Sequence, residues 1–274
     1  MGTPMTIAVP TTAALPVYDR IVVGIDDTPE SLEAARQAAV LRAPGGMLHL
    51  LAAVHTATAI HAGFAASSVA DQMLTGARAM LERAAAASRP TTHTLLEGRP
   101  APLLLEQLRR HHASLLAVGC HDHRRAAGLL VGAVGTVLLR DAPCSVLFAR
   151  RDSWPEGHPD RIVAGVDGSL ASILAVEVAR ALGDRFGVRL TLVVGLGGKL
   201  RDTSVVTSAY PEAVVDDRPP VDALVAASCS ADLVVVGSRG LHGLQALGSV
   251  SERVAHRAHS SVLVVRDHER SGQR

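Results

Sequence analysis

Short apolar runs alternate with amphipathic stretches along most of the chain. The apolar runs are rich in β-branched residues and show no polar alternation, which predicts strands buried on both faces of a parallel sheet. The expected strands occur in pairs, one member in each half of the chain: 20–26 with 161–167, 114–119 with 231–237, and 142–148 with 259–264.

The stretches between these strands have a helical period. Helices are expected at 29–43, 69–88 and 101–111 in the first half, and at 172–186, 221–228 and 250–258 in the second. Strands that alternate with helices form βαβ units with right-handed crossovers. The pattern therefore predicts the α/β fold class, with two doubly wound, Rossmann-like open parallel sheets in tandem and flanking helices.

Internal similarity sets the expected domain organisation. Arg20-Ile-Val-Val-Gly-Ile-Asp26 is matched by Arg161-Ile-Val-Ala-Gly-Val-Asp167. The stretch 195–214 has adjacent glycines and no helical period, so that crossover is expected to be a loop that leaves one sheet face less covered. The predicted organisation is a disordered leader at 1–17, a first domain at 18–151, a linker at 152–160, a second domain at 161–268 and a tail at 269–274.

Composition narrows the class of protein. A net charge of +1 gives no reason to expect nucleic acid or a membrane surface as a partner. Three scattered cysteines predict reduced thiols and a cytoplasmic location. The leader has no basic region typical of a signal peptide, and no apolar run reaches the roughly 18 residues of a membrane-spanning helix.

Candidate chemistry gathers where the strands of such sheets have their carboxyl ends, the usual place of ligands. Asp26 ends the first strand of the first half, and Asp167 ends the first strand of the second half. Gly168 and Ser169 follow Asp167 directly. A carboxylate at this position can accept hydrogen bonds from a ligand. Asp, Ser and Thr are equally suited to cap the following helix.

Two glycine-containing segments follow in the second half. Gly237-Ser238-Arg239-Gly240 comes directly after a strand, and its glycines would let backbone N–H groups approach phosphate oxygens. Gly248-Ser249 opens a helix, whose first N–H groups form an anion site. The first segment could instead be a plain turn, and the second an ordinary helix cap. The aspartate and the two glycine segments occur in this order in one βαβ arrangement, which favours a ligand site.

These residues resemble the universal stress protein family. The similarity rests on Val-Asp167-Gly-Ser, Val-Val-Val-Gly237-Ser-Arg-Gly240 and Leu-Gly248-Ser249-Val-Ser-Glu-Arg-Val, and it covers nearly the whole chain as a tandem of two domains. ATP-binding members of that family carry Gly-x-x-Gly, nine residues and then Gly-Ser/Thr. The resemblance implies two five-stranded parallel sheets, a role in stress response, and self-association through the last strands, within one chain or between two.

The resemblance also implies a ligand and the residues that hold it. The ligand is ATP, with Mg²⁺ as a companion and AMP or ADP as alternatives. The implied contacts are Asp167 and Gly168 at the ribose or adenine, Gly195 (matched by Ala53) against adenine, Gly237, Arg239 and Gly240 in the phosphate loop, Gly248 and Ser249 at the terminal phosphates, and Asp26, Gly119 and Gly132 as first-half counterparts.

Both halves depart from the family pattern. In the second half seven residues, not nine, separate Gly240 from Gly248, which would displace a phosphate donor by roughly 3–7 Å. In the first half Gly119-Cys-His-Asp122 replaces the double glycine, and Ala133 stands where the hydroxyl should be. We therefore expect the main nucleotide site in the second domain and a degenerate site in the first.

Other chemistry finds little support. The sequence has no Gly-x-x-x-x-Gly-Lys-Ser/Thr and no Gly-x-Ser-x-Gly, which excludes P-loop NTPases and acyl-transfer enzymes of the nucleophile-elbow type. His121-Asp122-His123 lacks the converging ligands of a metal centre, so no metal site is predicted. We expect a nucleotide-binding sensor and not an enzyme. The alternatives are a dimerising scaffold without nucleotide and a weak ATPase.

Overall fold

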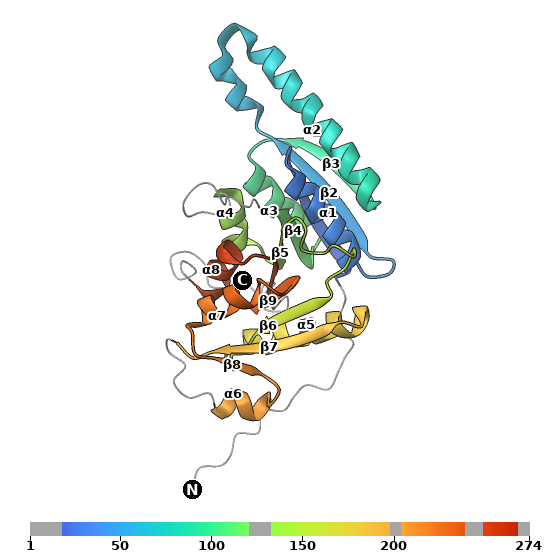
Figure 1. Ribbon diagram of the computed structural model, residues 1–274. Helices are drawn as coiled ribbons and strands as arrows, with labels where there is room; N and C mark the ends of the chain where they lie inside the picture. The colour runs from blue at the N-terminus through green and yellow to red at the C-terminus, as the bar shows by residue number, and fades with distance from the viewer. Residues whose placement is uncertain (1–17, 121–132, 198–203, 239–248, 268–274) are drawn as a thin grey trace.

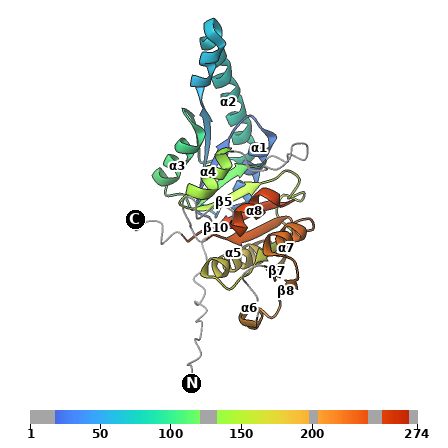
Figure 2. The same cartoon turned by 90° about the vertical axis from the view of Figure 1, so that its left-hand side faces the viewer.

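The computed structural model describes residues 18–120, 133–197, 204–238 and 249–267. They form an α/β fold in which one ten-stranded sheet lies between two layers of helices (Figures 1 and 2). The first half contains β1 (Arg20–Ile25), α1 (Pro29–Leu41), β2 (Met47–Val54), η1 (Thr56–Ala65), α2 (Ala66–Ser88), β3 (Thr92–Glu97), α3 (Pro100–Arg110), β4 (Leu115–Gly119), α4 (Ala133–Asp141) and β5 (Ser145–Ala149). The second half contains β6 (Arg161–Gly165), α5 (Leu170–Phe186), β7 (Arg189–Gly195), α6 (Ser204–Ala209), β8 (Val214–Asp216), α7 (Pro220–Ala227), β9 (Leu233–Gly237), α8 (Val250–Arg257) and β10 (Ser261–Val265).

The predicted fold class is confirmed, with one difference in how the two sheets relate. The strand order is β3-β2-β1-β4-β5-β10-β9-β6-β7-β8, and the strands are parallel within each half. The last strands, β5 and β10, pair antiparallel and join the two five-stranded sheets into one. Leu147 and Leu263, which occupy equivalent places in the two halves, are register partners at this junction. The halves are therefore related by an approximate two-fold axis.

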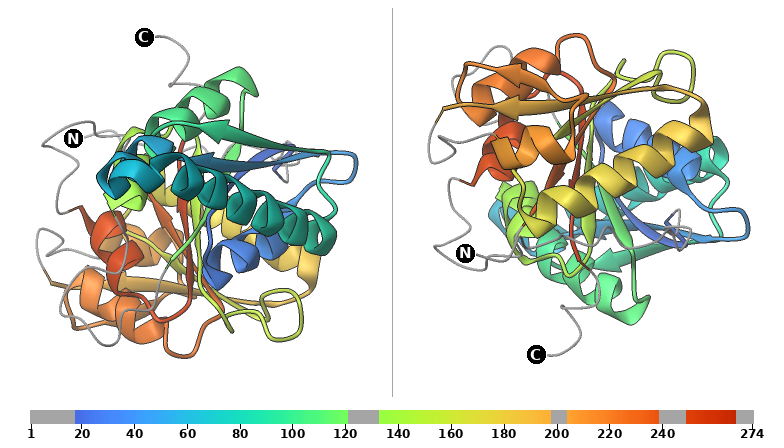
Figure 3. Two further views of the ribbon diagram at one scale, coloured as in Figure 1. Left: turned by 90° about the horizontal axis from the view of Figure 1, so that it is seen from above. Right: turned by 90° about the horizontal axis from the view of Figure 1, so that it is seen from below.

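Each face of the sheet has a hydrophobic core that runs through both halves. One core includes residues of α1, α2, α5 and α6 together with Trp154, and the other includes residues of α3, α4, α7 and α8. Seen from below, α5 lies across the strands of the second half (Figure 3). Ala, Val and Leu dominate these cores, and such small side chains let the helices pack closely on a sheet that is covered on both faces.

The crossover after β7 corrects one expectation. The loop predicted within 195–214 contains the short helix α6, whose Val206 is 3% exposed and belongs to the core. The six residues of α6 are too few to show a clear period in the sequence. The edge strand β8 remains partly uncovered, because Val214 and Val215 are 53% and 43% exposed.

The predicted linker packs between the halves. Trp154 is buried, and its indole N–H donates to the backbone oxygen of Asp232 at 3.1 Å. Arg36 of α1 donates to the backbone oxygens of Trp154 and Gly157, each at 3.1 Å. The division at 18–151 and 161–268 stays a prediction about folding units, since strands and cores cross it. The predicted leader and tail and the His121–Asp122–His123 segment lie outside the described residues.

Candidate functional site

The carboxyl ends of the strands form two separate edges. Within each half the strand order reverses between the first and fourth strands, β1 with β4 and β6 with β9, which are direct neighbours. Ligands of open α/β sheets bind at such switch points. Because β5 and β10 are antiparallel, the two edges lie on opposite sides of the sheet. The structure therefore offers two equivalent candidate sites, one for each half.

Sheet register fixes which residues correspond. Ile21 pairs with Leu115 as Ile162 pairs with Leu233, so Gly119 and Gly237 occupy the same place. By the same counting, Asp26 corresponds to Asp167. The pairs Arg20–Met47 and Arg161–Arg189 make Ala53 the counterpart of Gly195, in agreement with the sequence match.

The carboxylates of Asp26 and Asp167 hold the turns that begin α1 and α5. Oδ1 of Asp167 accepts hydrogen bonds from the backbone N–H of Ser169 at 3.0 Å and from its hydroxyl at 2.6 Å. Oδ1 of Asp26 accepts from the same two groups of Thr28. Thr28 and Ser169 are in turn the N-caps of their helices. Thr28 and Ser169, and not the two aspartates, thus cap these helices, and hydrogen bonds from the capping residues hold each carboxylate at the switch point.

Gly119 and Gly237 lie where a helix begins directly against the end of a strand. A Cβ atom on Gly237 would lie 2.1 Å from the backbone oxygen of Ala171 in α5, and one on Gly119 would lie 2.5 Å from the carbonyl carbon of Glu30 in α1. Both distances are far below van der Waals contact, so any side chain would push the helix away. Close helix–strand packing is therefore one reason for glycine here, separate from the predicted contact with phosphate.

Two further glycines shape the second site in ways the sequence did not reveal. Gly168 has a φ of +76°, and a Cβ there would lie 3.2 Å from Val206 of α6. A Cβ on Gly195 would lie 2.6 Å from the Cα of Pro220. The neighbouring N–H of Leu196 donates to the Asp216 carbonyl at 2.9 Å. Val206 and Pro220 therefore form part of the surroundings of this edge, and no motif in the sequence marked them.

Ser249 begins α8 at the same edge. Its hydroxyl accepts from the N–H of Glu252 at 3.2 Å and lies 3.2 Å from the hydroxyl of Ser251. The matching helix of the first half, α4, begins at Ala133, which has no hydroxyl. The remaining predicted site residues, Gly132, Arg239, Gly240 and Gly248, lie outside the described residues.

The helix layers bring two N-termini to this switch point. β6 leads into α5 on one face of the sheet, and β9 leads towards α8 on the other. Both helices therefore begin at the carboxyl edge, close to Asp167 and Ser249 respectively. Helix N-termini carry unpaired N–H groups and a partial positive charge, so the carboxyl ends of β6 and β9 suit an anion.

The described residues show little other chemistry. No group of three or more histidine, cysteine or acidic side chains among them could hold a metal ion. Burial raises the pKa of the Cys144 thiol to about 12, which makes that thiol unreactive. None of the described helices has the length and apolar character of a membrane span.

Comparisons with known proteins agree with this architecture. The model of the universal stress protein family matches residues 17–150 and 199–266. The universal stress protein Rv2623 of Mycobacterium tuberculosis is 30% identical over 292 aligned positions, which cover 90% of this chain and 96% of that protein. Rv2005c of the same organism is 34% identical over 203 positions, covering 63% and 68%.

A solved structure has the same arrangement of both halves. A universal stress protein from Archaeoglobus fulgidus superposes with a TM-score of 0.67 at 20% sequence identity, over 90% of this chain and 97% of that one. At this identity the likeness establishes the fold, and the sequence matches establish the relationship. The chain belongs to the universal stress protein family.

Proposed function

We propose that the chain binds an adenine nucleotide at the carboxyl edge of its second half and acts as a sensor or regulatory module in stress response. The observation that carries this proposal is that α5 and α8 both begin at the carboxyl edge of the neighbouring strands β6 and β9, where Ser169 and Ser249 cap them and Asp167 accepts from Ser169. Family membership supports the choice of ATP, with Mg²⁺ bound to its phosphates. ADP and AMP would make fewer of the same contacts.

The described residues suit the parts of such a ligand. The hydroxyl of Ser249 and the first N–H groups of α8 would face the terminal phosphates, where a helix start stabilises negative charge. The fixed carboxylate of Asp167 would accept from the ribose hydroxyls. Gly195, at the end of β7, would present its backbone to adenine.

The first half is proposed to be the weaker site. Ala133 supplies no hydroxyl at the start of α4, a loss of about 1 kcal/mol for one hydrogen bond. Asp26 and Asp27 place two adjacent carboxylates at this edge, and negative charges near a phosphate oppose its binding. We propose binding and not dedicated catalysis as the function, and a cytoplasmic location agrees with the three free cysteines.

A scaffold without nucleotide is the second candidate. The observation in its favour is the continuous sheet, in which β5 and β10 already satisfy within one chain the pairing that two separate domains would need. Both candidates predict a stable tandem, but only the first predicts that adenine nucleotides bind to it.

Calorimetric titration of the full chain with MgATP separates the two candidates. Ser249→Asp should keep the helix cap, since Asp caps as well as Ser, while its carboxylate repels the phosphates. We expect the ATP Kd to rise at least about tenfold with no change in Tm without ligand. Ala133→Asp, the matched change in the first half, should leave the Kd unchanged. If the unmodified chain does not bind ATP, the nucleotide proposal is wrong and the scaffold is the remaining candidate.

A further inference from the structure

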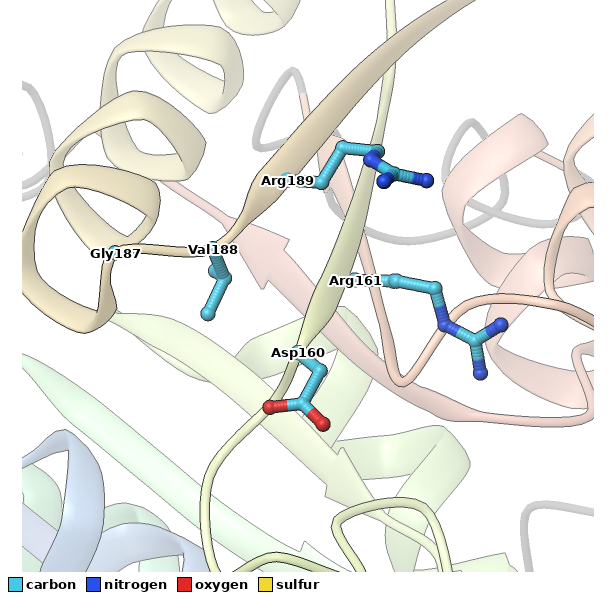
Figure 4. Close-up of a pocket in the computed structure, with 5 residues that line it drawn as sticks. All are labelled: Asp160, Arg161, Gly187, Val188 and Arg189. Carbon is cyan, nitrogen blue, oxygen red and sulfur yellow. The ribbon is translucent and has the colours of Figure 1, made fainter.

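A hollow of about 460 Å³ lies at the opposite end of β6 and β7 from the proposed nucleotide site. Residues at the amino ends of these strands and in the turn before β7 line it: Asp160, Arg161, Gly187, Val188 and Arg189 (Figure 4). The strands separate the hollow from the carboxyl edge, so a ligand here would not share contacts with a nucleotide at Asp167 or Ser249.

Two arginines lie side by side at this hollow. Arg161 and Arg189 are register partners on neighbouring parallel strands, so their side chains project from the same face. Figure 4 shows both guanidinium groups extending in the same direction, while the carboxylate of Asp160 points away from them. Like charges at directly neighbouring positions destabilise a sheet. Asp232 offsets the charge of Arg161, so the charge of Arg189 is the one that an added anion would neutralise.

Of the neighbouring acidic side chains that the structure describes, Asp232 pairs with Arg161 and Asp160 lies against His158. Oδ2 of Asp232 accepts from the backbone N–H groups of Asp160 and Arg161, both at 2.8 Å, and its Oδ1 lies 3.5 Å from the Arg161 guanidinium. Oδ1 of Asp160 lies 3.3 Å from Nδ1 of His158. Among the described residues, the exposed guanidinium of Arg189 has neither a hydrogen bond nor an ion pair. One full positive charge therefore lacks a partner at this hollow.

The first half shows that the repeat does not require this pair. There Arg20 is the register partner of Met47, and the Arg20 guanidinium lies 3.6 Å from the carboxylate of Asp19. Only the second half places two guanidinium groups together, so the pair is a feature of that half and not a consequence of the fold.

We propose that Arg161 and Arg189 bind the phosphate group of a small anion in this hollow. Each guanidinium presents a planar fork of N–H donors that matches pairs of phosphate oxygens, and a shared anion turns their mutual repulsion into attraction. The volume is in the range of small-molecule sites. Val188 forms the nearest apolar wall, where an organic part of the ligand would pack.

Calorimetric titration of the full chain with inorganic phosphate, at low salt, tests the site. We expect binding to one site, and Arg189→Met, which copies the first half, should raise the Kd at least about tenfold. Arg189→Lys should bind with intermediate affinity, because it keeps the charge and loses the fork. Arg20→Met is the matched control and should bind as the unmodified chain does.

Three outcomes would overturn the proposal: no phosphate binding, equal binding by Arg189→Met, or an equal loss in Arg20→Met. Phosphate binding that survives Arg189→Met but disappears in Ser249→Asp would place the anion at the nucleotide site and reject this one. A second titration with glycerol 3-phosphate identifies the source of the phosphate. Tighter binding than inorganic phosphate indicates an organic phosphate, and equal affinity indicates free phosphate, with the site supported in either case.

Discussion

Arg150 and Arg266 occupy equivalent places at the ends of β5 and β10, and each reaches across to a helix of the other half. Nη2 of Arg150 donates to the backbone oxygen of Ala255 in the last turn of α8 at 2.6 Å. Nη2 of Arg266 donates to the backbone oxygen of Leu139 in the last turn of α4. Both arginines are 6% exposed. A cation at a helix C-terminus satisfies carbonyl groups without an intrahelical partner and interacts favourably with the helix dipole.

Removal of one of these arginines should weaken the whole tandem. Arg150→Met leaves the carbonyl groups of Ala255 and Ser260 without their donor, and we expect a loss of about 2–4 kcal/mol in the free energy of unfolding. Urea unfolding measures it. Arg78→Met, at an exposed arginine of α2, is the control and should change stability by less than about 0.5 kcal/mol. A similar value for both variants would show that the crossed contacts contribute nothing.

Gly237 should not tolerate a methyl group. Gly237→Ala would place Cβ 2.1 Å from the backbone oxygen of Ala171, so α5 has to move, at a cost of about 3 kcal/mol. Gly76→Ala in α2 is the opposite case, since nothing lies within 4 Å of its Cβ position. That substitution should stabilise the chain by about 0.5–1 kcal/mol. Thermal unfolding of both variants checks the pair, and equal stability would contradict the close packing.

His49 should make stability depend on pH. Burial, followed by the nearby charges of His111, Arg110 and His93, lowers the pKa of His49 to about 4. The unfolded chain takes up this proton near pH 6.5. Stability is therefore complete above that pH and falls as the pH decreases from about 6.5 to 4, by at most about 3 kcal/mol.

His49→Leu tests this dependence. The variant should lose less stability than the unmodified chain between pH 7.5 and 4.5 in urea unfolding. His259→Gln, at an exposed histidine, serves as the comparison and should follow the unmodified chain. If the free energy of unfolding changes with pH in the same way for all three proteins, His49 is not the cause of the pH dependence.

Substitution of Asp26 and of Asp167 should have different effects on ligand binding and equal effects on stability. An amide oxygen can accept the same hydrogen bonds as Oδ1, so Asp26→Asn and Asp167→Asn should both keep their turns. Only Asp167→Asn should weaken ATP binding, by about three- to tenfold, since a neutral acceptor binds the ribose hydroxyls less strongly. Calorimetry measures both, and a larger effect of Asp26→Asn would reverse the proposed ranking of the halves.

The local sequence pattern was sufficient to predict most helices and strands. The helix expected at 172–186 begins at Leu170, because Ser169 caps it, and the helix expected at 101–111 begins one residue earlier with Pro100. The six-residue helix α6 was missed, since a single turn and a half shows no period. Local sequence thus defines long elements well and short ones poorly.

Long-range features were harder to predict. The resemblance implied that the last strands pair, but nothing in the sequence indicated that Arg150 and Arg266 cross between the halves. The candidate site was likewise predicted in part. Asp167 and Ser249 lie at one edge as expected. The approach of Val206 to the Cβ position of Gly168 depends on tertiary packing, which local sequence patterns do not encode.

The reciprocal arginines make each half part of the other's packing. A deletion of either half would leave the other with bare helix carbonyl groups and an open strand edge that invites aggregation. Substitutions that erase a ligand contact carry no such penalty. The first half could therefore lose a ligand contact and still cover the strand edge and the helix end of its neighbour through β5 and Arg150.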